Sequence, residues 1–310
     1  MMMAGLVLAG LTGGLTGGLT GGPGAARAQE LTGTLQKIKE TGTIIMGFRE
    51  TSVPFSYLDD QQKPVGYAID ICGKIIDAIR AELKLPGLKV ETMGVTSSNR
   101  IPLLTNGTID LECASTTNNA DRQKQVAYTN THFLTASRFL SKKASGIAGI
   151  DGLRGRTVVS VAGTSNIVQL NQFNTARKLG ITVLAAKDTV EAFLMVETDR
   201  AVAFVMDDVI LSALIAGSKE PAAYEIGDEA FSKPEPYGIM LRRGDAPFKA
   251  LADRATAALY ASPEITAIYA KWFQSPVPPK GLNYNVPIAP ALKYEFAHPT
   301  DSPNPDDYKS

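Results

Sequence analysis

Two successive series of short apolar runs and helical patterns constrain the fold of this 310-residue chain more than any other feature. In the first series, β-rich runs at 43–48, 89–93 and 109–111 alternate with helical patterns at 68–83 and 99–106. Strands that alternate with helices are typical of βαβ units, which build a parallel sheet with helices on its faces. The first series therefore predicts an α/β lobe.

A second series of the same kind follows Arg156. Its predicted strands are 157–161, 181–185 and 201–206, and its predicted helices are 165–179, 190–197 and a segment that ends at 216. Two α/β units in one chain predict a bilobal protein with two mixed or parallel sheets. Further helices are expected at 246–259 and 264–273, after an apolar run at 237–241.

This order of elements suggests that the chain leaves the first lobe and later returns to it. We expect lobe 1 to comprise 29–137 and 239–298, and lobe 2 to comprise 138–238. Two hinge strands would cross between the lobes, near 138–140 and 238–241. The last segment, 299–310, is rich in Pro, Asp and Ser, and this composition predicts a disordered tail.

The first 28 residues are typical of an export leader. Residues 4–19 carry no charge, and Ala26-Arg27-Ala28 has the A-x-A form of a signal-peptidase site. The usual positive region is missing, so the true start is left open, and a low-complexity tail on a cytosolic protein is the alternative. We expect a periplasmic protein cleaved near Ala28. The first cysteine is Cys72, so no lipid attachment site follows the cleavage point.

Charge and cysteine content narrow the classes of partner. The 31 basic and 31 acidic residues balance, which argues against nucleic acid or an anionic membrane as a partner. We expect a monomer.

Cys72 and Cys113 are an even pair in an exported chain, which permits one disulfide. Two separate buried thiols are equally consistent with the sequence.

Sequence patterns of enzymes and metal sites are sparse. The two histidines, His132 and His298, have no nearby ligand spacing, so neither a metal nor a cofactor is expected. His132 lies beside Phe133 and is interpreted as a structural residue. The chain contains no nucleophile elbow, no P-loop and no dinucleotide fingerprint.

Polar residues instead follow the predicted strands. Arg49, Ser115 and Asp207 lie at carboxyl ends of strands, which is where open α/β sheets bind ligands. Arg100 begins a helix, where a cation opposes the helix dipole unless it serves another purpose. The 163–165 turn opens a helix and presents N–H groups to an anion. Helix caps and surface ion pairs are the structural alternatives for these residues.

Together these residues match the outline of one kind of ligand. An arginine such as Arg122 can hold a carboxylate with two parallel charge-assisted bonds, and the hydroxyls at 115–117 can add hydrogen bonds. Two cationic clamps, one carboxylate and several hydroxyls would hold an ammonium and two carboxylates. One ammonium and two carboxylates are the charged groups of an acidic amino acid.

Four motifs in this order resemble one protein family. They are GFRETSVPFSY at 47–57, TSSNRIPLL at 96–104, STTNN at 115–119, and RAVAF at 200–204 followed by the acidic pair at 207–208. The chain resembles the periplasmic glutamate/aspartate-binding proteins of ABC importers, over residues 35–296. The resemblance implies a two-lobed clamp that closes on glutamate or aspartate and delivers it to an ABC permease. It implies a receptor and not an enzyme.

The resemblance also implies which residues contact the α-amino-acid group of the ligand. They are Arg122, Thr164, Ser165, Asp207, Ser115 and Thr117. Arg122 would hold the α-carboxylate together with the helix start at 164–165. Asp207 would accept the ammonium, and the two hydroxyls at 115 and 117 would add hydrogen bonds.

A second group would form the pocket for the ligand's side-chain carboxylate. By the same resemblance, this group comprises Arg49, Arg100 and Ser97. Thr189 would lie nearby, at a position where close relatives often carry a histidine. A hydroxyl cannot supply a cationic donor there, so the ranking of glutamate against aspartate stays open, as does acceptance of glutamine or asparagine.

Two other functions fit the same fold. One is a dehydratase of the cyclohexadienyl or arogenate type, which needs a general acid, and Glu50 and Glu112 are the nearest carboxylic acids to the expected site. The other is a ligand-sensing module that signals to a partner. The sequence does not locate a surface that would contact the permease.

Overall fold

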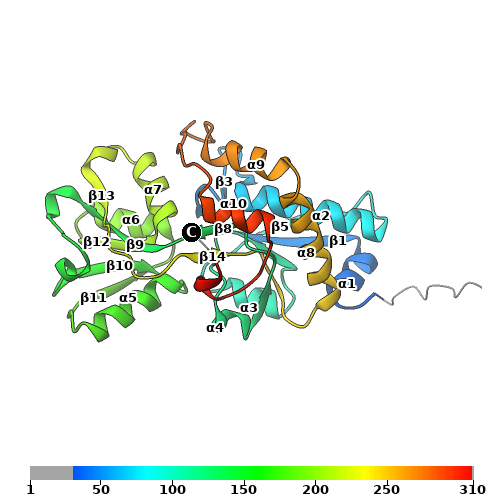
Figure 1. Cartoon of the computed structure of the whole chain (residues 1–310), viewed down its shortest axis with the longest axis horizontal. Coiled ribbons are helices and arrows are strands. Elements are labelled where there is room, and N and C mark those ends of the chain that lie inside the picture. Colours follow the sequence, from blue (N-terminus) through cyan, green and yellow to red (C-terminus); the bar gives the residue numbers. More distant parts are fainter. Residues whose placement is uncertain (1–30, 309–310) are drawn as a thin grey trace, which may run out of the picture. The chain divides into compact units, whose positions relative to one another are not determined.

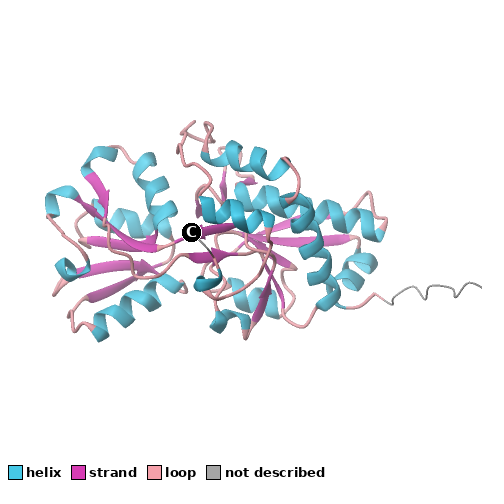
Figure 2. Cartoon of the chain, viewed as in Figure 1, coloured by secondary structure: helices cyan, strands magenta, loops and turns pink. Residues whose placement is uncertain are grey.

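The protein consists of two lobes, each built on a five-stranded sheet flanked by helices (Figures 1 and 2). The structure, a computed structural model, describes residues 31–308. The predicted leader at 1–28 lies outside these residues. In the described part of the chain, no helix combines the length and the apolar character needed to cross a bilayer.

The sheet of lobe 1 has the strand order β5-β1-β6-β15-β7. The strands are β1 (Thr43–Phe48), β5 (Lys89–Gly94), β6 (Leu111–Cys113), β7 (Val126–Tyr128) and β15 (Met240–Arg242). Strands β1, β5 and β6 run parallel, and β15 is antiparallel to both of its neighbours. The parallel arrangement predicted from the first βαβ series is confirmed for these three strands, and their carboxyl ends share one edge.

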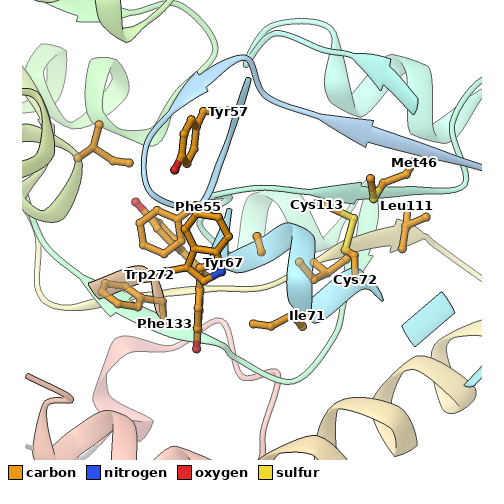
Figure 3. Close-up of a cluster of buried hydrophobic side chains, with 14 of the residues drawn as sticks. Met46, Phe55, Tyr57, Tyr67, Ile71, Cys72, Leu111, Cys113, Phe133 and Trp272 are labelled. Carbon is orange, nitrogen blue, oxygen red and sulfur yellow. A yellow bond between two sulfur atoms is a disulfide. The ribbon is translucent and has the colours of Figure 1, made fainter. Parts of the chain in front are cut away.

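Helices and a small sheet complete lobe 1. They are α1 (Gly33–Thr41), α2 (Tyr67–Leu83), α3 (Arg100–Thr105), α4 (Ala120–Gln123), α8 (Ala246–Tyr260), α9 (Glu264–Phe273), α10 (Pro290–Ala297), β2 (Thr51–Ser52), β3 (Ser56–Leu58) and β4 (Pro64–Val65). The apolar face of α2, with Ile71, Ile75 and Ile79, is buried, as its helical spacing predicts. Figure 3 shows part of this core, where the rings of Phe55 and Phe133 make an edge-to-face contact.

Lobe 2 repeats the pattern with the strand order β11-β10-β12-β9-β13. Its elements are β9 (Ser137–Lys142), β10 (Thr157–Val161), α5 (Ser165–Ala176), β11 (Thr182–Ala186), α6 (Thr189–Glu197), β12 (Ala203–Asp207), α7 (Asp208–Gly217) and β13 (Tyr224–Ile226), with short 3-10 turns at Lys143–Ser145, Ile150–Leu153 and Pro221–Ala223. Strands β10, β11 and β12 are parallel to one another. β9 is antiparallel to both of its neighbours, β12 and β13, so the edge strand β13 runs in the same direction as the three parallel strands. The sheet is therefore mixed, as expected.

Two short strands connect the lobes. β8 (Phe133–Thr135) leads from β7 toward β9, and β14 (Glu235–Tyr237) leads from β13 toward β15. The two strands pair with each other in antiparallel register, with Tyr237 opposite Phe133. The chain therefore passes between the lobes twice, side by side, which is the arrangement of a two-strand hinge.

The last segment differs from the disordered tail predicted for 299–310. Residues 299–308 are described and contain a 3-10 turn, Pro305–Asp307. The backbone N–H of Thr131 donates to the carbonyl of Thr300 at 2.8 Å, and the Asn118 amide donates to the carbonyl of Asp301 at 2.8 Å. Composition misses this order because the partners of the segment lie on lobe 1, far away in sequence.

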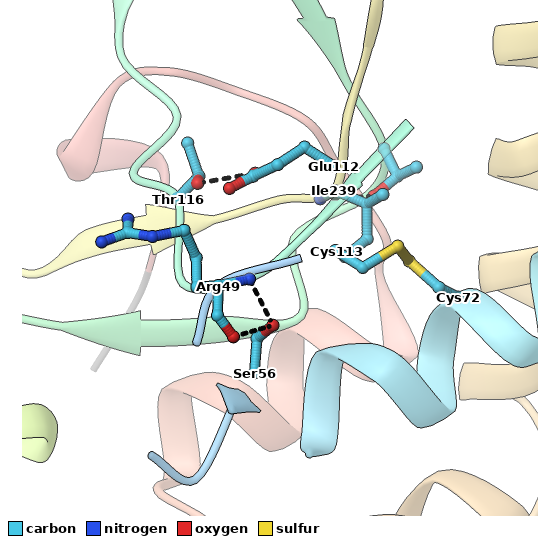
Figure 4. The surroundings of a disulfide bond; sticks show 8 residues. Arg49, Ser56, Cys72, Glu112, Cys113, Thr116 and Ile239 are labelled. Carbon is cyan, nitrogen blue, oxygen red and sulfur yellow. Dashed lines mark hydrogen bonds between the residues drawn. A yellow bond between two sulfur atoms is a disulfide. The ribbon is translucent and has the colours of Figure 1, made fainter. Parts of the chain in front are cut away.

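A disulfide between Cys72 and Cys113 links α2 to β6 (Figure 4). The sequence leaves open whether these cysteines form a disulfide or remain two separate thiols, and the structure shows the disulfide. Both residues are fully buried, and the bond closes a loop with a sequence separation of 41. A cross-link of this kind removes conformations from the unfolded chain and so stabilises the fold.

We expect the double variant Cys72→Ala/Cys113→Ala to lose about 4 kcal/mol of unfolding free energy, from the loop-entropy relation for a loop of this length. Urea denaturation, compared with the unchanged protein in oxidising buffer, measures the difference. Dithiothreitol should shift the unchanged protein in the same direction and leave the double variant unaffected. Equal stability of the two proteins would show that the disulfide contributes nothing.

The hinge strand β14 carries a buried carboxyl group. The Glu235 side chain accepts a hydrogen bond from the Gln169 amide at 2.9 Å and is 7% exposed. Burial, reinforced by the nearby charge of Asp207, raises the pKa of Glu235 to about 7. Since the ordinary value is 4.5, the folded protein holds a proton here that the unfolded chain releases between these two pH values.

The folded state consequently loses stability as the pH rises from about 4.5 through about 7, because Glu235 must then ionise in a buried place. We expect Glu235→Gln to gain stability relative to the unchanged protein between pH 5 and pH 8, by at most about 3 kcal/mol. Urea denaturation across this range gives the difference, with the exposed Glu220→Gln as the control. If the difference in unfolding free energy between the two proteins does not change with pH, the raised pKa of Glu235 is contradicted.

Candidate functional site

A small polar cavity lies where the two lobes meet. Its lining residues are Arg49, Ser97, Arg100, Ser115, Thr117 and Arg122 from lobe 1, and Thr164, Ser165, Asn166, Met206 and Asp207 from lobe 2. The structure therefore brings together every site residue named from the sequence except Thr189. The space that the cavity leaves open is only about 10 Å³.

Arg49 follows β1, at the carboxyl edge of the lobe 1 sheet. Its backbone N–H donates to the Ser56 hydroxyl at 2.9 Å, a contact visible in Figure 4. Its Nη1 donates to the Ser97 hydroxyl at 2.6 Å. Burial lowers the pKa of the Arg49 guanidinium, and the negative charge of Glu112 opposes that shift. The side chain is thus a desolvated cation that faces the cavity.

Arg100, at the start of α3, is held by a chain of two hydrogen bonds. Its Nη1 donates to the Thr116 hydroxyl at 2.7 Å, and this hydroxyl donates to Glu112 Oε2 at 2.8 Å. Glu112 Oε1 lies 3.8 Å from the same Nη1. Burial, followed by the proximity of Arg122, lowers the pKa of Arg100 to about 9, which keeps the group charged at neutral pH.

Glu112 itself does not line the cavity, and sequence reasoning did not identify it as a partner of Arg100. It is fully buried in β6, behind the arginines. A carboxylate inside an otherwise apolar strand is the signal that could have revealed it, because such a group needs a cation or hydrogen-bond donors nearby.

Arg122 lies in α4, a helix of four residues whose first turn is capped by the Asn119 side chain. Its Nη1 donates to the Thr117 carbonyl at 2.8 Å. Its Nη2 donates to the Gly163 carbonyl of lobe 2 at 3.3 Å. The hydroxyls of Thr117 and Ser165 also meet across the lobes, at 3.2 Å. Arg122 therefore contacts the 163–165 turn, as an α-carboxylate clamp in this place requires.

Asp207 ends β12 and supplies the carboxylate of the site. Asn166 donates to its Oδ1 at 2.8 Å, and the Tyr237 hydroxyl donates to its Oδ2. Burial raises the pKa of Asp207, and both hydrogen bonds oppose that rise. Asn166, Met206 and Tyr237 were not named from the sequence. Asn166 and Met206 are chain neighbours of named residues, whereas Tyr237 comes from the hinge strand and had no local signal.

Thr189 is the site residue that the structure places elsewhere. It begins α6, and its hydroxyl donates to the backbone carbonyl of Thr51 in lobe 1 at 2.7 Å. The preceding Asp188 caps the helix by accepting hydrogen bonds from two backbone N–H groups. Thr189 thus contacts the opposite lobe and is not among the lining residues of the cavity, so its role in binding stays a prediction.

His132 is a structural residue by its surroundings. It is fully buried beside the rings of Phe55, Tyr67 and Tyr237. Burial lowers its pKa to about 3, so the imidazole is neutral at physiological pH. Across residues 31–308, no cluster of three or more His, Cys, Asp or Glu side chains could hold a metal ion.

A larger cavity of about 480 Å³ lies between α6, α7 and the segments 50–58 and 277–284. Its lining is mainly apolar, with Val190, Leu194 and Pro278 among its residues. It lacks the convergent buried arginines of the smaller cavity. The chemistry of a charged ligand therefore points to the smaller one.

The charges of the small cavity fit one class of ligand. Three guanidiniums meet two carboxylates, Asp207 and Glu112, which leaves one uncompensated positive charge. An amino acid with an acidic side chain carries two carboxylates and one ammonium, and its net charge is minus one. Such a ligand would neutralise the site and pair each of its own charges with an opposite one.

Comparison with known proteins agrees with this geometry. Residues 44–275 match the family described as "Bacterial extracellular solute-binding proteins, family 3". The L-glutamate/L-aspartate-binding protein of Pseudomonas aeruginosa is 50% identical over 275 residues, covering 88% of this chain and 91% of the relative. The glutamate/aspartate import solute-binding protein of Escherichia coli is 44% identical, covering 86% of this chain and 88% of the relative.

A solved structure shares the architecture. An ancestral arginine-binding protein bound to arginine superimposes with a TM-score of 0.67 at 28% identity, over 75% of this chain and 98% of that one. The family match spans residues 44–275, which are most of the described residues. The chain therefore belongs to family 3 of the bacterial extracellular solute-binding proteins.

Proposed function

We propose that this protein is a periplasmic receptor that captures glutamate or aspartate between its lobes and delivers it to an ABC permease. The observation that carries the proposal is the buried cavity, in which three arginines and one aspartate converge from both lobes. Two relatives with high identity are named for glutamate and aspartate binding, which supports the same ligand here.

The α-amino-acid group would bind at the end of the cavity formed by Arg122 and Asp207. The start of α5, where backbone N–H groups and the helix dipole favour an anion, and the Arg122 guanidinium both suit a carboxylate. Asp207, with its two oxygens fixed by Asn166 and Tyr237, suits an ammonium. Ser115 and Thr117 would supply further hydrogen bonds.

The side-chain carboxylate would bind at the other end, against Arg49 and Arg100. Ser97 already bonds Arg49, and Thr116 already bonds Arg100, so both guanidiniums are fixed before a ligand arrives. A fixed pair of cations favours a charged carboxylate over a neutral amide, since the amide leaves a desolvated charge uncompensated. This end of the cavity would therefore select the acids.

Ligand capture would require movement of the lobes. The space left inside the cavity is small, and several contacts cross between the lobes, including Arg122 to Gly163 and Thr189 to Thr51. Entry therefore requires the lobes to part about the β8–β14 hinge. A ligand that touches both lobes favours the closed form, which would be the form that meets the permease.

The remaining features belong to the same proposal. The leader would direct export and be cleaved near Ala28, and the mature protein would act as a monomer without a cofactor. No observation favours the dehydratase alternative: Glu50 lines the larger cavity, and Glu112 lies behind the site as a hydrogen-bond acceptor. Neither carboxyl group faces the place where a substrate would bind.

We expect Arg122→Ala to weaken binding of glutamate, aspartate and glutamine alike by about 100-fold to 1,000-fold, because it removes a buried partner of the α-carboxylate that all three share. Calorimetric titration measures the three affinities. Lys124→Ala, an exposed cation on the same turn, serves as the control and should bind normally. Near-normal affinity of the Arg122 variant would remove this residue from the site.

Arg49→Met tests the other end of the cavity. We expect its glutamate affinity to fall by about 100-fold or more, while its glutamine affinity falls much less, since the amide has no charge to lose a partner. Titration of both ligands into the variant and the unchanged protein gives the ratio. Equal losses for the acid and the amide would show that Arg49 does not recognise the side chain.

A further inference from the structure

The segment 299–308, here called the C-terminal strap, lies beyond residues 44–275 that match the family. We propose that this strap positions the loop 117–123, and through it Arg122, for binding of the α-carboxylate. The inference rests on the proposed function and extends it to a part of the chain that sequence composition assigned to disorder. The strap is a positioning element, because none of its residues lines the cavity.

One carbonyl of the strap joins both ends of the loop. The Asp301 carbonyl accepts from the Asn118 amide at 2.8 Å and from the Gln123 amide at 2.9 Å. The Gln123 amide also donates to the Asn118 side-chain oxygen at 2.9 Å. The three groups form a closed set of hydrogen bonds, with Thr117 just before it and Arg122 inside it.

The loop needs such support because its helix is very short. α4 has four residues, and a helix of this length gains too few hydrogen bonds to hold its own shape. The Arg122 guanidinium bonds to the Thr117 carbonyl of the same loop and to Gly163 of the opposite lobe. When the lobes part, the second bond is lost. The position of the guanidinium then depends on the backbone of 117–123.

The strap is itself fixed to the rigid part of lobe 1. The Asp301 carboxylate lies 2.8 Å from Lys249 Nζ on α8. The Thr300 N–H donates to Glu295 on α10 at 2.7 Å, and the Thr300 carbonyl accepts from Thr131, just before β8. The Tyr308 hydroxyl bonds to the Thr131 hydroxyl at 2.8 Å. These anchors connect the loop 117–123 to two helices and to the hinge.

One further contact reaches lobe 2 and carries little of the effect. Lys233 and Asp306 form an ion pair at 2.6 Å, but both side chains are about two-thirds exposed. Exposed pairs of this kind contribute little to stability. The proposal therefore depends on Asp301 and its two amide donors, and Lys233→Ala serves as a matched control.

The first test is a chain that ends at His298. We expect its affinities for glutamate and aspartate, measured by calorimetry, to fall by about tenfold or more, from the loss of two hydrogen bonds that fix the loop. Both affinities should fall by the same factor, because Arg122 contacts the group that the two ligands share. Lys233→Ala should bind within about twofold of the unchanged protein.

Gln123→Met provides a milder change and decides the question if the shortened chain does not fold. It keeps the length of the side chain and removes the donor to Asp301, so we expect a smaller loss, about threefold to tenfold. The melting temperature with and without saturating glutamate separates positioning from general stability. A positioning role reduces the ligand-induced rise, whereas a purely structural role lowers both temperatures equally.

The strap proposal is overturned if the full chain binds glutamate and both the shortened chain and Gln123→Met bind it with unchanged affinity. The proposed function would then still stand. Equal lowering of both melting temperatures with normal affinity would overturn it as well. Failure of the unchanged protein to bind either acid would instead overturn the proposed function. The two failures are therefore distinguishable.

Discussion

The burial of three guanidiniums between the lobes is the constraint on which the rest of the site depends. A desolvated cation is costly unless opposite charge and hydrogen-bond acceptors surround it. Here Glu112 and Thr116 hold Arg100, Ser97 holds Arg49, and two carbonyls hold Arg122. One positive charge is left over among these groups, and the charges of an acidic amino acid would complete the set.

The fold places these charges by bringing several strand ends to one edge. β1 and β6 are parallel neighbours, so Arg49 and the polar residues after Cys113 emerge side by side. The disulfide from Cys113 to α2 anchors β6 next to Glu112, the buried counter-charge (Figure 4). In lobe 2, Asp207 emerges at the equivalent edge, and the hinge strand adds Tyr237. Strand ends of both lobes therefore meet at the cavity, next to the hinge strand.

Local sequence patterns predicted the sheets and much of the candidate site. They failed for residues whose contacts are with residues distant in sequence. The βαβ alternation and the rule for strand ends located Arg49, Ser115 and Asp207, because both depend on neighbours in the chain. Thr189 does not line the cavity, and its hydroxyl instead bonds Thr51 across the lobes, a contact that its local sequence does not indicate. Tyr237 was missed because its partner Asp207 lies far away in sequence. Glu112 was missed although a carboxylate inside an apolar strand is a local signal. The segment 299–308 is ordered because it contacts residues 118–131 and 249. The amino-acid composition of the segment gives no information about such distant partners.

The most direct test of the account is calorimetric titration of the mature protein, refolded to strip any retained ligand, with glutamate, aspartate, glutamine and asparagine. The charge balance of the cavity predicts tight binding of the two acids and weak binding of the two amides. Preference for an amide or for a neutral amino acid would contradict it, because the paired guanidiniums of Arg49 and Arg100 would then face no carboxylate.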